Sequence, residues 1–419
     1  MISFLKKNFF TLKEELQSFS SQQRAFSLFA MLCCFFICCE YSAIRPVSNS
    51  LFISAFSTKW LPYAWLAVVP LNFALVSLYN SLLPKWGSYK FFCCLVTVVM
   101  GVNCIVALLV KQFPSLAFFF YIWKEVYVLM MFQLVWSIIH NNIKLDKAKY
   151  LYGIFFGVGG LGSVVGASFP GFFAIACGSE TLIFLTLPLY LLLYYSQRNM
   201  QRFSTGEKIT VQEGEKGGFL HGVRLIQKSR FLLFALFLVV VMQMISAIVD
   251  FQFNYFLEKA FTEKDLRTQF SARILGIVHT LNMILQFLGV YLLIRLIGYR
   301  RSHYILPSVL GVSASLLAAF PLFPIASAAF ITCKALDFSL FGVIKEMLYV
   351  PLQPDEKYRA KAIIDVFAYR TSKAFASLLI LSVTAFLPIQ ALSWVSIFLS
   401  ALWLFTIGYG LREYEKLVA

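Results

Sequence analysis

The chain alternates long apolar stretches with short polar segments, and each apolar stretch approaches the length of a membrane-crossing helix. About 20 residues of helix span the hydrocarbon core of a bilayer. The predicted spans lie at residues 25–55, 60–83, 90–110, 115–140, 150–174, 180–196, 230–257, 270–297, 303–323, 325–350, 360–386 and 389–411. The pattern therefore predicts an all-α membrane protein with about twelve transmembrane helices.

The composition agrees with this interpretation. Apolar residues make up 60% of the 419 residues and charged residues 13%, against roughly 45–50% and roughly 25% in soluble domains. The net charge of +16 does not predict a nucleic-acid partner, because Lys and Arg punctuate the spans and do not gather on one face. The nine cysteines lie in apolar stretches without metal-ligand spacing, so we expect no metal, cofactor or disulfide.

The distribution of Lys and Arg between alternate loops predicts the orientation. One side, which includes both termini, holds 24 of these cations, and the other side holds 5. Positive charge concentrates in the cytoplasmic loops of membrane proteins. We therefore expect both termini in the cytoplasm and an even number of spans.

The longest polar stretch divides the spans six and six. Residues 197–229 are rich in glycine and mixed charge, which is typical of a linker. This predicts one six-helix bundle at residues 1–196 and another at 230–419. Two pairs of charges inside the spans, Glu40 with Asp250 and Lys124 with Lys334, share an offset of 210 residues. The offset indicates two duplicated bundles related by a pseudo-twofold axis along the membrane normal, as in many solute transporters.

Charged side chains inside the predicted spans are the main candidates for function. The cations are Arg45, Lys124, Arg273, Lys334, Lys345, Arg370 and Lys373, and the acids are Glu40, Glu125, Asp250, Asp337, Glu346 and Asp365. Each charge at mid-bilayer costs about 2.5–3.5 kcal/mol on insertion scales. Such a set predicts a hydrated pathway or a ligand. The alternative is that charges near the span ends only snorkel or form structural pairs.

Helical spacing supports a lined face on the tenth span. Lys334, Asp337, Phe341 and Lys345 follow one another at i, i+3, i+7 and i+11. The excess of cations over acids predicts an anionic solute, and Lys and Arg are suitable donors to phosphate.

A glycine-rich run occurs in the fifth span. Its members are Gly153, Gly157, Gly159, Gly160, Gly162 and Gly166. No Gly-Lys-Ser/Thr ending follows, so we expect close helix packing and not a phosphate-binding loop. The spans also contain no HExxH, no paired catalytic aspartates and no Ser/His arrangement, so we do not expect an enzyme.

The stretch from Lys334 to Lys373 reads KALDFSLFGVIKEMLYVPLQPDEKYRAKAIIDVFAYRTSK. It resembles the ATP/ADP translocase family, the nucleotide transporters of obligate intracellular bacteria and plastids. The element from Tyr41 to Arg45, together with Glu125 and Asp250, also falls where that family carries functional residues. The resemblance implies the major-facilitator fold, a bacterial inner membrane, and either exchange or proton-coupled uptake of nucleotides.

This chain also departs from the family pattern. Residues 46–49 replace a charged segment that includes a lysine of the family, and Asn254 stands where a lysine is expected in the seventh span. ATP/ADP exchange is therefore one hypothesis, and proton symport of another anionic metabolite is the alternative. The predicted solute-binding residues are Arg45, Lys124, Glu125, Asp250, Lys334, Asp337, Lys345, Glu346, Arg370 and Lys373.

Overall fold

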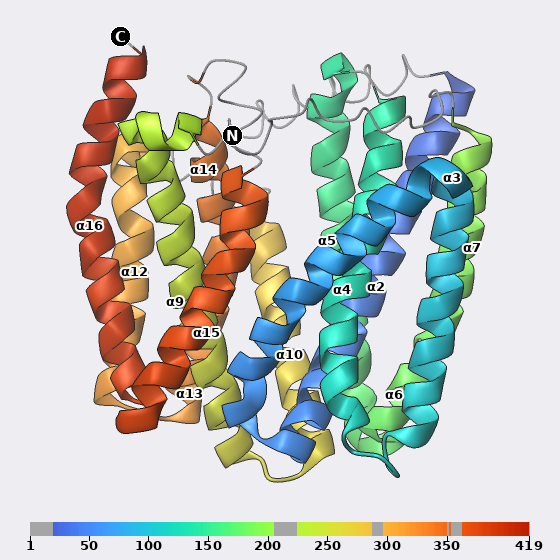
Figure 1. Cartoon of the computed structure of the whole chain (residues 1–419), viewed down its shortest axis with the longest axis horizontal. Helices are drawn as coiled ribbons and strands as arrows, with labels where there is room; N and C mark the ends of the chain where they lie inside the picture. Colours follow the sequence, from blue (N-terminus) through green and yellow to red (C-terminus); the bar gives the residue numbers. More distant parts are fainter. Residues whose placement is uncertain are drawn as a thin grey trace. The chain divides into compact units, whose positions relative to one another are not determined.

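The computed structural model describes residues 20–143, 145–204, 224–286, 296–349, 352 and 363–418. Throughout these residues the regular structure is helical (Figure 1), which confirms the predicted all-α class. Ten of the helices are long and apolar enough to cross a membrane. Two further segments, α10 (Lys264–Ile284) and the shorter apolar helix Thr371–Phe386, occupy the places of the predicted eighth and eleventh spans.

By its internal contacts the described chain forms two compact units. The first unit comprises residues 20–52, 72–204 and 268–276. It contains α2 (Ser21–Phe56) up to residue 52, α3 (Leu61–Leu109) from residue 72, and the whole of α4 (Leu116–Asn142), α5 (Leu145–Cys177), α6 (Ser179–Leu185) and α7 (Leu187–Arg202). A cluster of buried apolar residues from α2, α3, α4, α5 and α7 forms its core.

One residue joins the predicted second and third spans within this unit. Gly87 has a φ of 73°, in the left-handed region that favours glycine. Helix α3 therefore changes direction at a single position, and Figure 1 shows this bend in blue. The loop expected between residues 83 and 90 is helical on both sides of Gly87.

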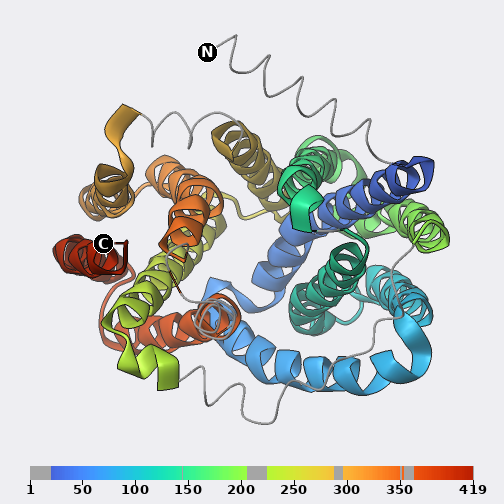
Figure 2. The same ribbon diagram turned by 90° about the horizontal axis from the view of Figure 1, so that it is seen from above.

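The second unit comprises residues 53–71, 224–267, 277–286, 296–349, 352 and 363–418. Besides most of α10 and the short helix η1 (Thr58–Trp60), it contains α9 (Arg230–Ala260), α12 (Tyr299–Ala319), α13 (Phe323–Leu336), α14 (Gly342–Leu348), α15 (Tyr369–Phe386) and α16 (Ala391–Val418). Two π-helical turns, η3 (Asp337–Phe341) and η5 (Ile363–Ala368), precede α14 and α15. Helices α12 and α16 pack side by side, as both ribbon views show (Figure 2).

Two glycines bring α5 against the backbone of α2. A Cβ atom at Gly162 would lie 2.3 Å from the carbonyl oxygen of Phe35, and one at Gly166 would lie 2.0 Å from that of Cys39. Both distances are too short for any side chain. The helices can approach this closely only because residues 162 and 166 are glycines, which confirms that part of the run serves helix packing. Gly153 and Gly160 meet no neighbouring atom within 4 Å.

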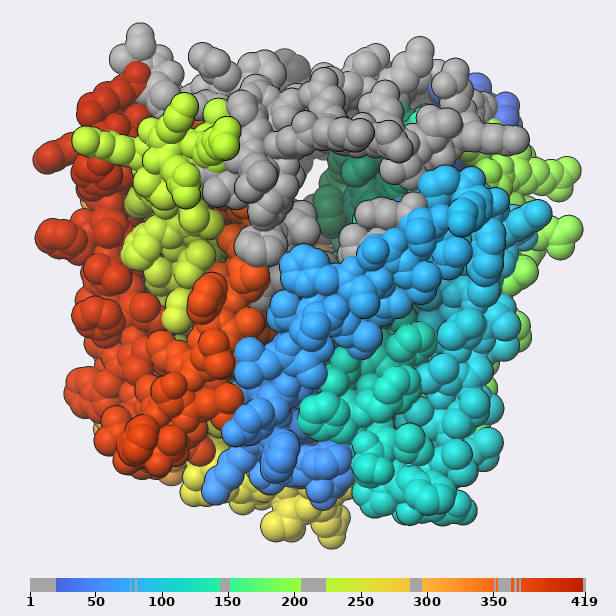
Figure 3. Space-filling view, in the orientation of Figure 1, coloured from blue at the N-terminus to red at the C-terminus, as the bar shows by residue number. Residues whose placement is uncertain are grey.

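Segments distant in the sequence meet within the second unit. Thr58 donates its backbone N–H to Glu258 Oε2 at 2.9 Å, and Arg267 Nη2 donates to Ser54 Oγ at 2.9 Å. Helix α15 lies beside the first turns of α3, as the space-filling view shows (Figure 3), with Lys373 Nζ 4.6 Å from the centre of the Trp65 ring. Residues 53–71 thus pack with elements from the second half of the sequence.

The predicted division at a linker stays a prediction, because residues 205–223 lie outside the described residues.

Candidate functional site

Helix α9 directs a row of polar side chains toward one face. Gln243, Ser246, Asp250 and Asn254 are spaced at i, i+3, i+7 and i+11, and all four are buried. They face Lys334 of α13 and Asp337 of η3. We call these six residues the α9 cluster.

Lys334 occupies the centre of the α9 cluster. Its Nζ donates to Ser246 Oγ at 2.8 Å and lies 3.5 Å from Asp250 Oδ2. Asn254 Nδ2 donates to Asp250 Oδ1 at 2.9 Å, so the carboxylate has a second donor. An N⁺–H···O⁻ bond is ordinarily about 2.7–2.9 Å long. The ammonium is therefore bound more closely by the hydroxyl than by the carboxylate, which leaves it able to contact another anion.

A π-helical turn begins at Asp337, three residues after Lys334. Gln243 Nε2 donates to both carboxylate oxygens of Asp337, at 3.1 and 3.3 Å. The wider turn shifts the register of the residues that follow, and π turns frequently occur at functional sites. Phe341 packs edge-on against Trp403 of α16, with ring centres 5.9 Å apart. Lys334 and Asp337 therefore both face α9, while Phe341 also contacts α16, and the lined face expected from regular helical spacing stays a prediction.

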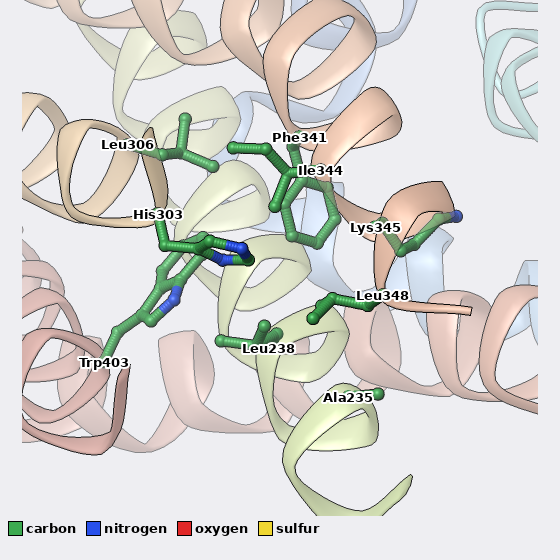
Figure 4. Close-up of a pocket in the computed structure, with 9 residues that line it drawn as sticks. All are labelled: Ala235, Leu238, His303, Leu306, Phe341, Ile344, Lys345, Leu348 and Trp403. Atoms are coloured by element: carbon green, nitrogen blue, oxygen red, sulfur yellow. The ribbon is translucent and has the colours of Figure 1, made fainter. Parts of the chain in front are cut away.

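Lys345 and Glu346 lie on α14, beyond the π turn. The stem of Lys345 borders a mainly apolar pocket that also includes His303, Phe341 and Trp403. Figure 4 shows its ammonium directed away from the other labelled side chains. The pocket itself offers few polar groups to an anionic solute. Glu346 is exposed on the same helix.

The first unit holds a second charged group, on α2 and α4. Lys124 Nζ lies 2.8 Å from Glu125 Oε1, and Tyr41 of α2 donates to the same oxygen at 3.4 Å. The ammonium also lies 4.0 Å from the centre of the Tyr121 ring, a distance typical of a cation–π contact. Lys124 is 1% exposed, whereas the side chain of Glu125 is 24% exposed. We call Tyr41, Lys124 and Glu125 the α4 cluster.

Three further predicted residues lie on α2 and α15. Arg45 is half-buried on α2, one turn after Tyr41. The Lys373 ammonium forms a cation–π contact with Trp65 in the second unit. The side chain of Arg370 lies outside the described residues, although its backbone belongs to α15.

Glu40 is a buried acid that the predicted solute-binding set did not include. Its Oε1 accepts hydrogen bonds from Tyr127 of α4 at 2.6 Å and from Tyr190 of α7 at 2.5 Å. Asn103 of α3 donates to the Tyr190 hydroxyl at 2.7 Å. We call these four residues the Glu40 cluster. The presence of an acid in an apolar span marked Glu40 as unusual, but its partners are distant in the sequence and no local pattern indicates them.

The residues related by the 210-residue offset therefore have different partners in the two units. In the second unit the acid of α9, Asp250, pairs with Lys334. In the first unit the lysine pairs with Glu125 on its own helix, and Glu40 is bound by two tyrosines. Among the described residues of these clusters, Lys124 and Lys334 are buried ammoniums beside carboxylates, and Glu40 and Asp337 are buried carboxyl groups that accept hydrogen bonds from neutral side chains. Among the described residues, no three His, Cys, Asp or Glu side chains come together as a group that could hold a metal ion.

Comparisons with known proteins agree with a transporter fold. The model of the TLC ATP/ADP transporter family matches residues 323–417, a part of the chain that includes Lys334 to Lys373. No curated protein matches the chain significantly.

Solved structures with the same fold cover nearly the whole chain. A variant of the nucleoside transporter NupG has a TM-score of 0.67 at 13% identity, over 92% of this chain and 99% of that one. The POT family transporter PepTSo has a TM-score of 0.66 at 10% identity, over 95% and 99%. A D-xylose-proton symporter has a TM-score of 0.64 at 13% identity, over 92% and 97%. The chain therefore has the fold of these structures, the major-facilitator fold. Its apolar helices and the family match support an integral membrane protein of the transporter class.

Proposed function

We propose that this protein is a secondary active transporter of nucleotides, which exchanges ATP and ADP by alternating access. The observation that carries the proposal is the match of the ATP/ADP transporter family to residues 323–417, because this part includes Lys334, the central cation of the α9 cluster. The proposed solute-binding residues are Arg45, Lys124, Glu125, Asp250, Lys334, Asp337, Lys345, Glu346, Arg370 and Lys373. We further propose a bacterial inner membrane with both termini in the cytoplasm.

The chemistry of the two lysines supports a phosphate-bearing solute. Lys124 and Lys334 are buried ammoniums, and each has a carboxylate beside it that compensates its charge while no solute is bound. A phosphate oxygen can replace either carboxylate as the acceptor of a charge-assisted hydrogen bond. Release of the solute restores the internal pair, so neither cation is left buried and uncompensated.

A second candidate is proton symport of another anionic metabolite. Asn254, which stands where the resembled family has a lysine, donates to Asp250 and adds no positive charge. The α9 cluster therefore carries one cation fewer than the family pattern implies. A solute with less phosphate charge than ATP would need fewer cations.

Counterflow in proteoliposomes tests both candidates. Vesicles loaded with ADP should take up labelled ATP, and unlabelled ADP should compete while unrelated anions should not. Lys334→Gln should reduce this uptake strongly. Lys416→Gln is the matched control, because Lys416 is 68% exposed and pairs only with nearby Glu413 in the described chain. Competition by a different anion and not by nucleotides would favour the second candidate, and no ATP uptake at all would refute the first.

A further inference from the structure

Glu40 is a buried acid with one carboxyl oxygen that has no hydrogen-bond partner. It is 1% exposed, at the middle of α2. Oε1 accepts hydrogen bonds from Tyr127 and Tyr190, while Oε2 is buried and has no hydrogen-bond partner. Within the described residues no Lys, Arg or His nitrogen forms an ion pair with this carboxyl group.

The contacts of Glu40 fit a neutral carboxylic acid. An ionised carboxylate distributes its charge over both oxygens, so its Oε2 would be a buried charged atom without a donor. Burying an unpaired charge costs far more than burying an unpaired hydroxyl group. In the neutral acid, Oε1 is the carbonyl oxygen that accepts from two tyrosines, and Oε2 carries the proton.

The groups that surround Glu40 reinforce this assignment. Helix α4 presents the hydroxyl of Tyr127, α7 presents that of Tyr190, and α3 presents the amide of Asn103. All three are neutral. On α2 itself the neighbouring Cys39 is also neutral as a thiol, and its backbone oxygen lies against the glycine face of α5.

Helices α2 and α4, which meet at the Glu40–Tyr127 hydrogen bond, also carry the residues of the α4 cluster. Tyr41, which donates to Glu125, directly follows Glu40 on α2. Lys124 precedes Tyr127 by three residues on α4, so the two side chains are neighbours along one helix face. Glu40 is thus connected to the α4 cluster by one residue along α2 and by one turn along α4, in buried surroundings that screen charge weakly.

We propose that Glu40 is a proton-binding site of this protein, and that its proton promotes the binding of an anionic solute at the α4 cluster. The second part rests on the proposed function. Protonation removes one negative charge close to Lys124, which leaves that ammonium more attractive to an anion. The coupling is reciprocal, so bound solute also strengthens proton binding. This linkage has the sign needed for symport of a proton with an anion.

Infrared spectroscopy tests the proton site without any solute. In purified protein at neutral pH, the wild type should show a carboxylic-acid C=O stretching band that Glu40→Gln lacks. Glu263→Gln is the control, because Glu263 is exposed and precedes α10, and this variant should keep the band. Tyr127→Phe keeps the carboxyl group but removes one hydrogen bond to its C=O, so the band should move to higher frequency. Identical bands in the wild type and Glu40→Gln, or an unmoved band in Tyr127→Phe, would overturn the assignment.

The pH dependence of ATP binding tests the coupling. The wild-type dissociation constant should increase with pH, by about 5- to 150-fold for a coupling free energy of ordinary size. Glu40→Gln, which is neutral at every pH, should bind ATP with nearly constant affinity, close to that of the wild type at low pH. An unchanged pH dependence in Glu40→Gln would overturn the coupling. Absence of ATP binding by the wild type would refute the proposed nucleotide solute, while the infrared band still decides the protonation of Glu40.

Discussion

Replacing Lys334 by glutamine distinguishes a solute-binding cation from a structural ion pair. The ammonium lies 2.8 Å from Ser246 Oγ and 3.5 Å from Asp250 Oδ2, and the side chains of the pair are 11% and 10% exposed. Removing one member of a buried pair costs about 3–5 kcal/mol, because the other charge stays buried. Asn254 still donates to Asp250 at 2.9 Å, so we expect the lower end of this range, about 3 kcal/mol.

The double variant Lys334→Gln/Asp250→Asn removes both charges together. Replacing a whole buried pair by neutral groups is often close to neutral for stability, so most of the loss should be recovered. Solute binding should not recover. A phosphate loses a hydrogen bond from a charged donor, which contributes about 1.5–3 kcal/mol and corresponds to an affinity about 10- to 150-fold weaker.

Two measurements on the same purified proteins decide between these roles. Thermal unfolding in detergent reports stability, and equilibrium binding of labelled ATP reports affinity. Asp250→Asn alone should be destabilised to a similar extent, because the Lys334 ammonium then stays buried without its carboxylate, but it should retain ATP binding, because Lys334 keeps its charge and its bond to Ser246. A double variant that regains both stability and ATP affinity would show that the Lys334 charge serves only the fold, and the site assignment would be refuted.

Two further variants test the packing of α5 and the contact at the end of α2. Gly166→Ala should destabilise the protein by about 1–3 kcal/mol, because the new Cβ would lie 2.0 Å from the backbone oxygen of Cys39. Gly153→Ala is the control and should be tolerated, because its Cβ would meet no atom within 4 Å. Equal unfolding temperatures of the two variants would contradict this reasoning. Arg267→Met removes the donor to Ser54 Oγ. The loss of about 1 kcal/mol of local stability should accelerate amide exchange at residues 54–58 roughly fivefold. Exchange at the wild-type rate would show that this hydrogen bond does not hold the segment.

The positions of the helices could be predicted from the apolar pattern. The first predicted span, residues 25–55, corresponds to α2 (Ser21–Phe56), and the seventh, residues 230–257, to α9 (Arg230–Ala260). In a membrane every backbone polar group must be paired internally, and a helix pairs these groups within one segment, so a long apolar stretch forms a helix. Length and hydropathy therefore determine these elements without knowledge of their neighbours.

The same pattern could not show where the helices change direction or pitch. Gly87 turns α3 through one residue, although the surrounding sequence suggested a loop. The π turn that begins at Asp337 inserts its extra residue within an almost uniformly apolar stretch. A shift of register leaves no trace in the sequence where apolar residues occur on every face, so the apolar pattern could not indicate this turn.

The partners of the charged residues could be identified only from the three-dimensional structure. The 210-residue offset relates Glu40 to Asp250, and it would assign each acid the same kind of partner in both halves. Asp250 does lie beside a lysine from another helix, but Glu40 lies beside Tyr127 and Tyr190. Duplicated helices preserve where an acid stands along its span. The residues that face it across the bundle can change one at a time, and a single sequence does not reveal that change.

This difference between the halves has a consequence for how charge is balanced during transport. An acid paired with a lysine holds its charge at all times, and it can exchange its partner only for another ion. An acid bound by hydroxyl groups can instead become neutral by taking a proton, because its partners do not require it to be charged. A carrier in which both acids were paired would therefore be suited to exchanging one anion for another. The arrangement around Glu40 adds a position where a proton can travel with the anion, and the response of ATP affinity to pH in Glu40→Gln distinguishes these two modes.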